Sequence, residues 1–318
     1  NSIVTGSGTF YSVYTPFYKK ARQLTVESPK PTPKALYYTG RIRNVYKTSI
    51  KEIKRTLSVE YKYEHMLVKG GRKEGLSLLS KVASMQTEYD TTRDDTTKPT
   101  TYLSAHIKFG TLSIREVFYK FKEVSESLVG QLYWNEFYDQ LMFNLPIDRT
   151  LGNGNFKNKK VKWSEENKKK YLQLWKDGKT GFPFIDAGMR QLNAIGWMHN
   201  RARMAVANFL AMALLVDWRE GEKYFAQRLI DYDVSQNNGN WQWSVGLGVD
   251  KTGYLRMYNP YSQSKKHDAD CEYIKKYVPE LRNVPTHHIH AWGKYHTDYS
   301  EVYTAPIVDF TERRQIAL

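Results

Sequence analysis

Residues 184–216 read FIDAGMRQLNAIGWMHNRARMAVANFLAMALLV, and this stretch decides the fold class. Its first part, up to residue 195, is an amphipathic helix pattern that ends at Gly196, a residue type that often terminates helices. The second part, residues 198–216, is nearly all apolar, so it forms a helix that must be buried. An amphipathic helix followed by a buried one predicts a helical core.

Helix signals continue on both sides of this stretch. The sequence SIRE at 113–116 is a capping box, residues 128–143 carry large aromatic side chains at helical spacing, and Ser164 precedes two glutamates as an N-cap should. Convincing alternating strand patterns are few. We therefore predict one predominantly α-helical domain over residues 41–318, preceded by an irregular, linker-like segment over residues 1–40 that is rich in Gly, Ser, Thr and Pro.

Composition restricts the partners and the compartment. Lys and Arg outnumber Asp and Glu by 48 to 33, a formal net charge of +15, which favours a polyanionic partner, although solubility alone would also explain it. The single cysteine, Cys271, excludes an internal disulfide and a cysteine-ligated zinc site. The longest apolar run, residues 204–216, is too short to span a bilayer, and no signal segment opens the chain. We predict a soluble intracellular protein without a membrane partner.

A group of hydroxyl side chains is the first candidate for chemistry. Thr100, Thr101 and Ser104 precede a helix-like stretch, where they form either an anion or pyrophosphate site or ordinary helix caps. The sequence has no glycine-rich phosphate loop and no GxSxG motif. His199 fits a structural hydrogen bond better than a metal site, because no second ligand stands at a suitable spacing, and we predict no bound metal.

Arg203 lies in an apolar setting and therefore needs an anion. It shares a helix face with Asn200 and Met204 within a strongly apolar segment. A guanidinium held there requires an acidic side chain or a phosphate, and Asp231 and Asp233 are the candidate acids. A purely structural ion pair is the alternative interpretation.

Four motifs together resemble one known family. The segments WNEFY (134–138), WKDGKTGFPFIDAGMRQLNAIGWMHNRARM (175–204), DWREGEKYF (217–225) and DYDVSQNNGNWQW (231–243) resemble the photolyase and cryptochrome family. The resemblance implies an all-α FAD-binding domain. That family's N-terminal α/β domain, which seats an antenna pigment, is absent from this sequence, which is expected to begin at the family's interdomain linker.

The resemblance also implies an activity and its partners. Photolyases hold FAD in the helical domain, extrude a pyrimidine dimer from DNA and split it under blue light by electron transfer from reduced FAD. The protein is therefore expected to be a deoxyribodipyrimidine photo-lyase that acts on damaged DNA. We also expect a monomer, and a separate antenna-domain polypeptide is a further candidate partner. Two alternatives stay open: a cryptochrome-like blue-light receptor, and one half of a split or decayed photolyase without efficient repair.

One set of residues matches the family's FAD-binding positions. On the phosphate and ribose side these are Tyr89, Thr100, Thr101, Leu103 and Ser104, and around the ring and ribityl chain they are Trp197, Asn200, Arg203, Asp231, Asp233 and Asn237. The resemblance places Asn237 at the flavin N5, where an amide can donate or accept a hydrogen bond. Next to it, Asn238 and Gly239 are expected to form a tight turn.

Electron transfer and DNA contacts are implied in the same way. The family's tryptophan relay, through which oxidised flavin is photoreduced from the surface, matches Trp241, Trp218 and Trp175. The positions that contact the dimer or the DNA match Trp134, Gln131, Trp243, Met204, Arg201 and Arg256, and the lysine-rich loop 157–162 would add attraction to the phosphate backbone.

Departures from the family pattern indicate the subtype. Asn200 and Met204 stand where enzymes for six–four lesions carry histidines, so the chain looks closest to class I cyclobutane pyrimidine dimer photolyases. Gln131 stands where those enzymes carry Glu, and an amide cannot supply a proton as readily, which predicts repair of reduced efficiency. Leu128 and Asn135 remove contacts that bacterial enzymes make, which predicts weaker DNA affinity.

Overall fold

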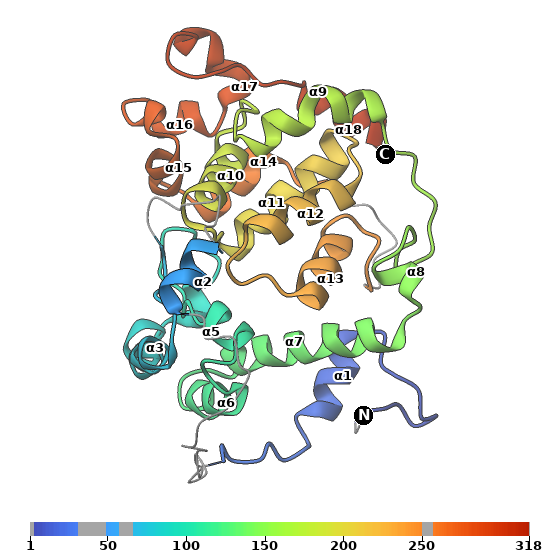
Figure 1. Cartoon of the computed structure of the whole chain (residues 1–318). Coiled ribbons are helices and arrows are strands. Elements are labelled where there is room, and N and C mark those ends of the chain that lie inside the picture. Colours follow the sequence, from blue (N-terminus) through green and yellow to red (C-terminus); the bar gives the residue numbers. More distant parts are fainter. Residues whose placement is uncertain (1–2, 31–48, 57–65, 250–256, 318) are drawn as a thin grey trace.

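The protein is helical throughout the part that the structure describes. The structure is a computed structural model, and it describes residues 3–30, 49–56, 66–249 and 257–317 (Figure 1). Within these ranges there is no β-strand, which confirms the predicted fold class. None of the helices in these ranges combines the length and the apolar composition that crossing a membrane requires.

The described residues form a series of mostly short helices. They are α1 (Tyr14–Ala21), α2 (Ile50–Thr56), α3 (Arg72–Met85), α4 (Tyr89–Thr92), α5 (Ser104–Lys108), α6 (Ile114–Lys122), α7 (Glu126–Asn144), α8 (Ile147–Thr150), α9 (Glu165–Lys176), α10 (Pro183–Ile195), α11 (Asn200–Asn208), the π-helix η1 (Phe209–Ala213), α12 (Trp218–Arg228), α13 (Val234–Ser244), α14 (Pro260–His267), α15 (Glu272–Tyr277), the short η2 (Pro279–Leu281), α16 (Thr286–Ile289), α17 (Trp292–Tyr295), η3 (His296–Tyr299) and α18 (Phe310–Ala317).

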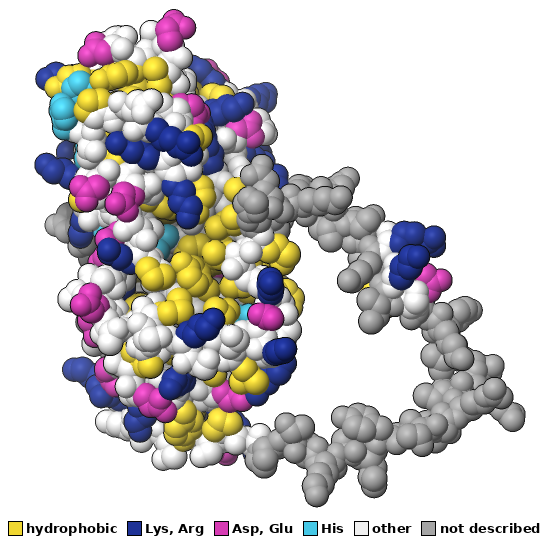
Figure 2. All heavy atoms as spheres, turned by 90° about the vertical axis from the view of Figure 1, so that its left-hand side faces the viewer, with side chains coloured by type: hydrophobic (Ala, Val, Ile, Leu, Met, Phe, Trp, Pro, Cys, Tyr) yellow, Lys and Arg dark blue, Asp and Glu magenta, His cyan; other side chains and the backbone are white. Residues whose placement is uncertain are grey.

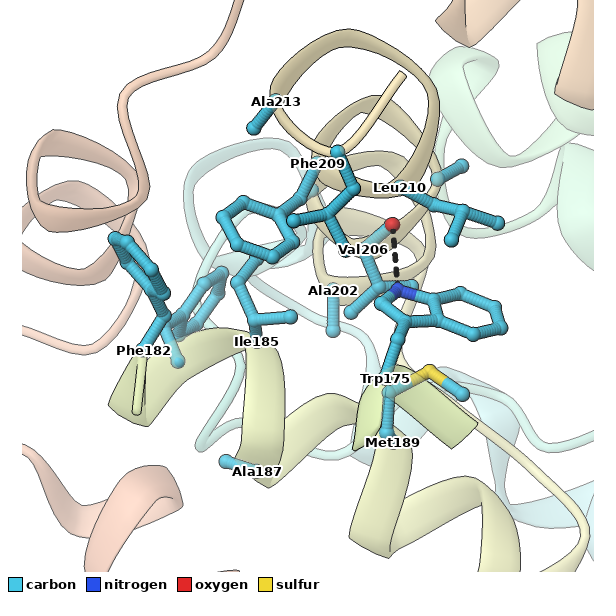
Figure 3. Packing of buried hydrophobic residues seen from close by; sticks show 14 of the residues in the cluster. Trp175, Phe182, Ile185, Ala187, Met189, Ala202, Val206, Phe209, Leu210 and Ala213 are labelled. Carbon is cyan, nitrogen blue, oxygen red and sulfur yellow. Dashed lines mark hydrogen bonds between the residues drawn. The ribbon is translucent and has the colours of Figure 1, made fainter. Parts of the chain in front are cut away.

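The apolar stretch found in the sequence is the centre of the largest core cluster. It forms α11 and η1, which pack with α10 and α9, and Figure 3 shows the indole of Trp175 directed at α11. Its Nε1 donates a hydrogen bond to the Val206 carbonyl oxygen over 3.0 Å. The helix begins at Asn200 instead of residue 198, because His199 is its N-cap and accepts a hydrogen bond at Nδ1 from the Arg201 N–H over 3.2 Å.

A second layer contains α3, α6, α7 and α1. Helix α7 crosses the lower half of the molecule under α13, and α6 packs beside it (Figure 1). The predicted capping box is confirmed at the start of α6, where the side chains of Ser113 and Glu116 both bond backbone N–H groups. The residues 1–40 are not irregular throughout, because they contain α1, whose Phe17 is fully buried against α7.

The predicted tight turn at Asn238 and Gly239 is wrong. Both residues lie inside α13, and the glycine serves close helix packing instead. A Cβ atom on Gly239 would lie 2.2 Å from the Tyr138 ring on α7, far inside van der Waals contact. The missing side chain therefore lets α13 approach α7, and this contact brings the residues of both helices to one site.

Charge is spread over the surface that Figure 2 shows. On this flank, hydrophobic side chains gather across the middle, and Lys and Arg side chains lie above and below them. The net charge of +15 is thus not confined to one end of this face.

Candidate active site

One cavity gathers the polar residues that the sequence singled out. It has a volume of about 390 Å³ and lies between the α4–α5 segment, the first half of α7, α11 and the α12–α13 region. Every residue predicted to hold FAD lines it: Tyr89, Thr100, Thr101, Leu103, Ser104, Trp197, Asn200, Arg203, Asp231, Asp233 and Asn237. A cavity of this size suits a small-molecule ligand.

A left-handed residue brings the hydroxyl segment to the cavity wall. Tyr102 has a φ of 54°, an unfavourable conformation for a residue with a Cβ atom. Tyr102 lies between the two threonines and α5, and Thr100, Thr101 and Ser104 all line the cavity. The Tyr102 ring meets the Trp197 ring edge-on at 5.4 Å between centroids, which ties this segment to the start of α11.

Arg203 forms the ion pair that the sequence predicted, with Asp231. Its Nη2 lies 2.9 Å and 3.2 Å from the two carboxylate oxygens, and its Nε donates to the Met198 carbonyl oxygen over 2.8 Å. The Asp231 side chain is only 4% exposed and the Arg203 side chain 27%. A charge-assisted pair at this depth fixes both side chains and places a cation in the cavity wall.

Asp233 makes a different set of contacts. It is the N-cap of α13, and its Oδ1 accepts hydrogen bonds from the backbone N–H groups of Ser235 and Gln236 over 3.0 Å and 3.2 Å. Its Oδ2 accepts from Lys108 Nζ over 2.7 Å. Burial acts to raise the pKa of Asp233, but the Lys108 and capping bonds prevail and hold this pKa below its usual value. Sequence reasoning missed Lys108, which lies 125 residues away in the chain.

Asn237 is oriented by Glu222, a second residue that the sequence analysis missed. The Asn237 Nδ2 donates to the Glu222 main-chain carbonyl oxygen over 3.0 Å and to its carboxylate Oε1 over 2.9 Å. Both amide hydrogens are then used, so the Oδ1 of Asn237 is the atom left to accept a hydrogen bond from a ligand. Burial raises the pKa of Glu222, and the bond from Asn237 offsets part of that rise.

The three tryptophans of the predicted relay are all buried. Trp241 lines the cavity and Trp175 packs against it edge-on, with 6.2 Å between ring centroids. Their exposed fractions are 2% for Trp241, 1% for Trp218 and 0% for Trp175, so none of them offers an edge to solvent. Trp163 is only partly buried and lines a second pocket together with Trp218. The partial exposure of the Trp163 indole beside Trp218 is a signal that the sequence alone did not supply.

Three of the predicted DNA-facing residues also line the cavity. Gln131 is exposed there, with its Nε2 donating to the Ser127 carbonyl oxygen over 3.2 Å. Arg201 is engaged by Asp94, with its Nη2 and Nε 2.6 Å and 2.8 Å from Oδ1. Met204 is the third, and its sulfur lies 3.6 Å from the Arg201 Nη1.

The remaining predicted DNA contacts lie elsewhere. Trp134 and Trp243 do not line this cavity. The Trp134 ring is stacked on Tyr14 of α1, with 3.5 Å between centroids and 6° between planes. Arg256 lies outside the described residues. The structure therefore brings the predicted cofactor residues together more completely than the predicted lesion residues.

The family described as the FAD binding domain of DNA photolyase matches residues 128–318. The chain belongs to the DNA photolyase family. It is 35% identical to a deoxyribodipyrimidine photo-lyase of Halobacterium salinarum over 99% of this chain and 69% of that protein. It also resembles a bacterial class III photolyase from Agrobacterium tumefaciens, with a TM-score of 0.84, 32% identity, and coverage of 99% of this chain and 69% of the other. An archaeal photolyase from Sulfolobus tokodaii, crystallised with two FAD molecules, gives a TM-score of 0.79, 35% identity, and coverage of 99% and 68%.

FAD is the cofactor of this photolyase domain, and the cavity residues fit it. Hydroxyls at one side suit phosphate and ribose groups, and the cations Arg93, Arg201 and Arg203 suit an anionic ligand. The buried Nε1 of Trp241, which lines the cavity, has no hydrogen-bond acceptor among the described residues, so a ligand atom can complete it. The described residues contain no cluster of three or more His, Cys, Asp or Glu able to bind a metal.

Proposed function

We propose that the protein is a light-driven deoxyribodipyrimidine photo-lyase that splits cyclobutane pyrimidine dimers in DNA. The observation that carries the proposal is the convergence of all the matched FAD positions in one cavity that also holds Gln131 and Met204. Relatives that carry this enzyme name, at 35% identity over nearly the whole chain, support it.

Residues of three segments would hold FAD. The hydroxyls of Thr100, Thr101 and Ser104 would bind the phosphates, and Asp233 and Arg203 would flank the ring side. Bound FAD in its reduced form supplies the light-excited electron donor. The positive guanidinium of Arg203, held by Asp231, would stabilise negative charge on a bound ring, and the Asn237 Oδ1 would accept a hydrogen bond from it.

Gln131, Met204 and Arg201 would meet the dimer at the cavity. The Gln131 amide can donate a hydrogen bond to a pyrimidine carbonyl group, and Met204 offers an apolar surface. Arg201 would contact a phosphate by exchanging its partner Asp94, or by using Nη1. Trp134 and Trp243 stay the proposed aromatic contacts of the flipped bases.

We extend the proposed relay by Trp163. Trp241 would be its inner member and Trp218 its middle member, and an electron route from the surface needs an exposed end that the buried Trp175 does not offer. Trp163 shares a pocket with Trp218 and is partly exposed, which supports it as that end.

The decisive experiment uses the purified protein with FAD bound and chemically reduced. Blue light should restore the ultraviolet absorbance of the bases in an oligonucleotide that carries a thymine dimer, and a dark sample is the control. A protein that holds FAD but causes no light-dependent change would exclude the repair function.

A photoreceptor of cryptochrome type is the second candidate. The stacking of Tyr14 on Trp134 and the Arg201–Asp94 pair favour it, because both occupy groups that a lesion would need. Equal affinity for damaged and intact duplex DNA, together with a light-induced conformational change, would support this candidate over repair.

The proposed oligomeric state is a monomer, and the proposed further partner is a separate antenna-domain polypeptide. The chain spans about 69% of the length of relatives such as the Halobacterium enzyme. Light scattering on the purified protein tests whether it is a monomer. Co-purification of a second polypeptide with the protein from its native source tests whether an antenna-domain partner exists.

A further inference from the structure

The first residue of α1 lies flat on an indole of α7. The Tyr14 and Trp134 rings have 3.5 Å between their centroids and 6° between their planes. This separation is about the contact distance of two carbon atoms, so the rings overlap with hardly any lateral offset. Isolated aromatic pairs prefer an offset or edge-on arrangement, with centroids about 4.5–7 Å apart. Other contacts must therefore hold the two rings in register.

Three contacts hold Tyr14 in place. Its hydroxyl group donates a hydrogen bond to the Gly130 carbonyl oxygen over 2.8 Å. Gly130 lies one turn before Trp134, so the Tyr14 ring lies along α7 across this turn. The ring also meets Phe137 edge-on, with 5.7 Å between centroids. Phe17, one turn later on α1, is fully buried against α7 and anchors the helix that carries Tyr14.

Part of the Trp134 indole stays open. The side chain is partly exposed, although Tyr14 covers one face of the ring. Tyr138, one turn later on α7, has its ring centroid 5.8 Å away and its plane tilted by 29°, so it overlaps the indole far less. Gln131, which lines the FAD cavity, stands three residues before Trp134, and such neighbours share one side of a helix. The indole and the Gln131 amide therefore project from the same side of α7.

We propose that Tyr14 is a positioning residue for the lesion: it fixes the Trp134 indole in the orientation in which a flipped pyrimidine stacks on the open part of this ring. The inference rests on the proposed function, in which Trp134 contacts the flipped bases. A side chain that is already fixed in the free protein loses no rotamer freedom when the base stacks on it. Tyr14 thus favours damaged DNA, in which a base is extruded, over intact duplex DNA, and the selectivity depends on a residue of the N-terminal segment.

The orientation of the indole can be measured without DNA or light. In the protein labelled with fluorotryptophan, the fluorine NMR signal of Trp134 is the one that the Trp134→Phe variant lacks. Tyr14→Leu removes the stacked ring, so this signal should shift and broaden, whereas Tyr14→Phe keeps the ring and should leave the signal close to its place. Tyr11→Leu is the matched control, because Tyr11 belongs to the same segment and meets Phe17 edge-on at 6.4 Å. An unchanged Trp134 signal in Tyr14→Leu would overturn the positioning role.

The effect on lesion recognition is measured as binding in the dark. The FAD-loaded protein is titrated with one oligonucleotide duplex that either carries or lacks a thymine dimer. Tyr14→Leu should lower the affinity for the damaged duplex about three- to tenfold and leave the affinity for the intact duplex unchanged, while Tyr14→Phe should bind both as the unchanged protein does. In a Trp134→Ala background, Tyr14→Leu should have no further effect, because the ring that Tyr14 positions is gone.

Other binding results would contradict the proposal in distinguishable ways. Tighter binding of the damaged duplex by Tyr14→Leu would overturn it, because Tyr14 would then block the indole. An equal loss for both duplexes would show that Tyr14 only stabilises the fold, and full damage selectivity in Trp134→Ala would show that this indole does not meet the lesion. These three results leave the repair function standing. Equal affinity of the unchanged protein for both duplexes would refute the proposed function and this role of Tyr14 together.

Discussion

The Asn237 side chain is locked by Glu222, which accepts both of its amide hydrogen bonds, at 3.0 Å through the main-chain oxygen and at 2.9 Å through the carboxylate. These two hydrogen bonds join the N-terminal halves of α12 and α13 and leave a single acceptor atom of Asn237 for the cavity. The orientation of a residue expected to touch the reactive part of FAD is therefore decided by a partner on another helix.

The Glu222→Gln variant should change the pH dependence of stability. Burial raises the folded-state pKa of Glu222 above the ordinary value of 4.5, so the folded protein binds more protons than the unfolded chain as pH rises through the range above 4.5. Stability in the native protein therefore falls through that range, and the neutral Gln removes this loss. Melting temperatures of both proteins across this range measure it. Parallel curves would contradict the expected role of Glu222, and Glu222→Ala, which also frees the Asn237 amide, is the comparison that separates charge from hydrogen bonding.

His199 should make the protein acid-sensitive. Burial, followed by the charges of His267, Arg203 and Arg201, lowers its pKa from 6.5 to about 4, with Asp94 acting in the opposite direction. The neutral folded form is fully favoured above the unfolded value of 6.5, and its contribution, about 3 kcal/mol at most, is lost as the pH falls from 6.5 toward 4. The His199→Asn variant keeps a helix-capping acceptor and should flatten this acid limb in urea titrations at a series of pH values. An unchanged acid limb would show that other groups control it.

Truncation of the Arg203 side chain should lower both the stability of the protein and the amount of FAD that it retains. Arg203→Ala leaves the nearly buried Asp231 without its cation, at a cost of roughly 3–5 kcal/mol. The flavin absorbance per protein after purification should fall with it. Arg22→Ala is the matched control, because its ion pair with Glu126 is exposed on both sides and contributes at most about 1 kcal/mol. Full retention of FAD in Arg203→Ala would count against the proposed position of the ring.

Gly239→Ala should destabilise the protein although alanine favours helices. The new Cβ meets the Tyr138 ring at 2.2 Å, so α13 and α7 must separate, at a cost of about 1–3 kcal/mol. Gly130→Ala is the matched helical control, since its Cβ finds no atom nearer than 3.8 Å and should gain roughly 0.5–1 kcal/mol. In thermal or urea unfolding, the change in the free energy of unfolding should have opposite signs in the two variants. Changes of the same sign would show that the contact with Tyr138 does not determine the effect at Gly239.

Replacing single tryptophans with phenylalanine should distinguish those that carry electrons to FAD from those that only stabilise the core. Trp241→Phe and Trp163→Phe should each block photoreduction of oxidised FAD and leave repair from chemically reduced FAD largely intact. Trp175→Phe should mainly lower stability, because it leaves space in a fully buried site and removes the hydrogen bond to Val206. Loss of photoreduction in Trp175→Phe at unchanged stability would return this residue to the relay in place of Trp163.

Short-range patterns determined much of this protein. The capping box at 113–116 and the apolar run after residue 198 predicted helices because they depend on neighbours three or four positions away. The order of the sequence motifs predicted the family and the residues that would bind FAD, and these residues line one cavity.

Only the tertiary structure decided how those residues are supported. Lys108 and Glu222 are partners of Asp233 and Asn237 through contacts between separate helices, and Gly239 is required by a ring on α7 instead of by a turn. Trp175 and Trp163 are the same residue type in the sequence, and only burial separates the core residue from the partly exposed one. A residue type and its spacing fix local geometry, whereas burial and long-range pairing arise from which distant segments pack together.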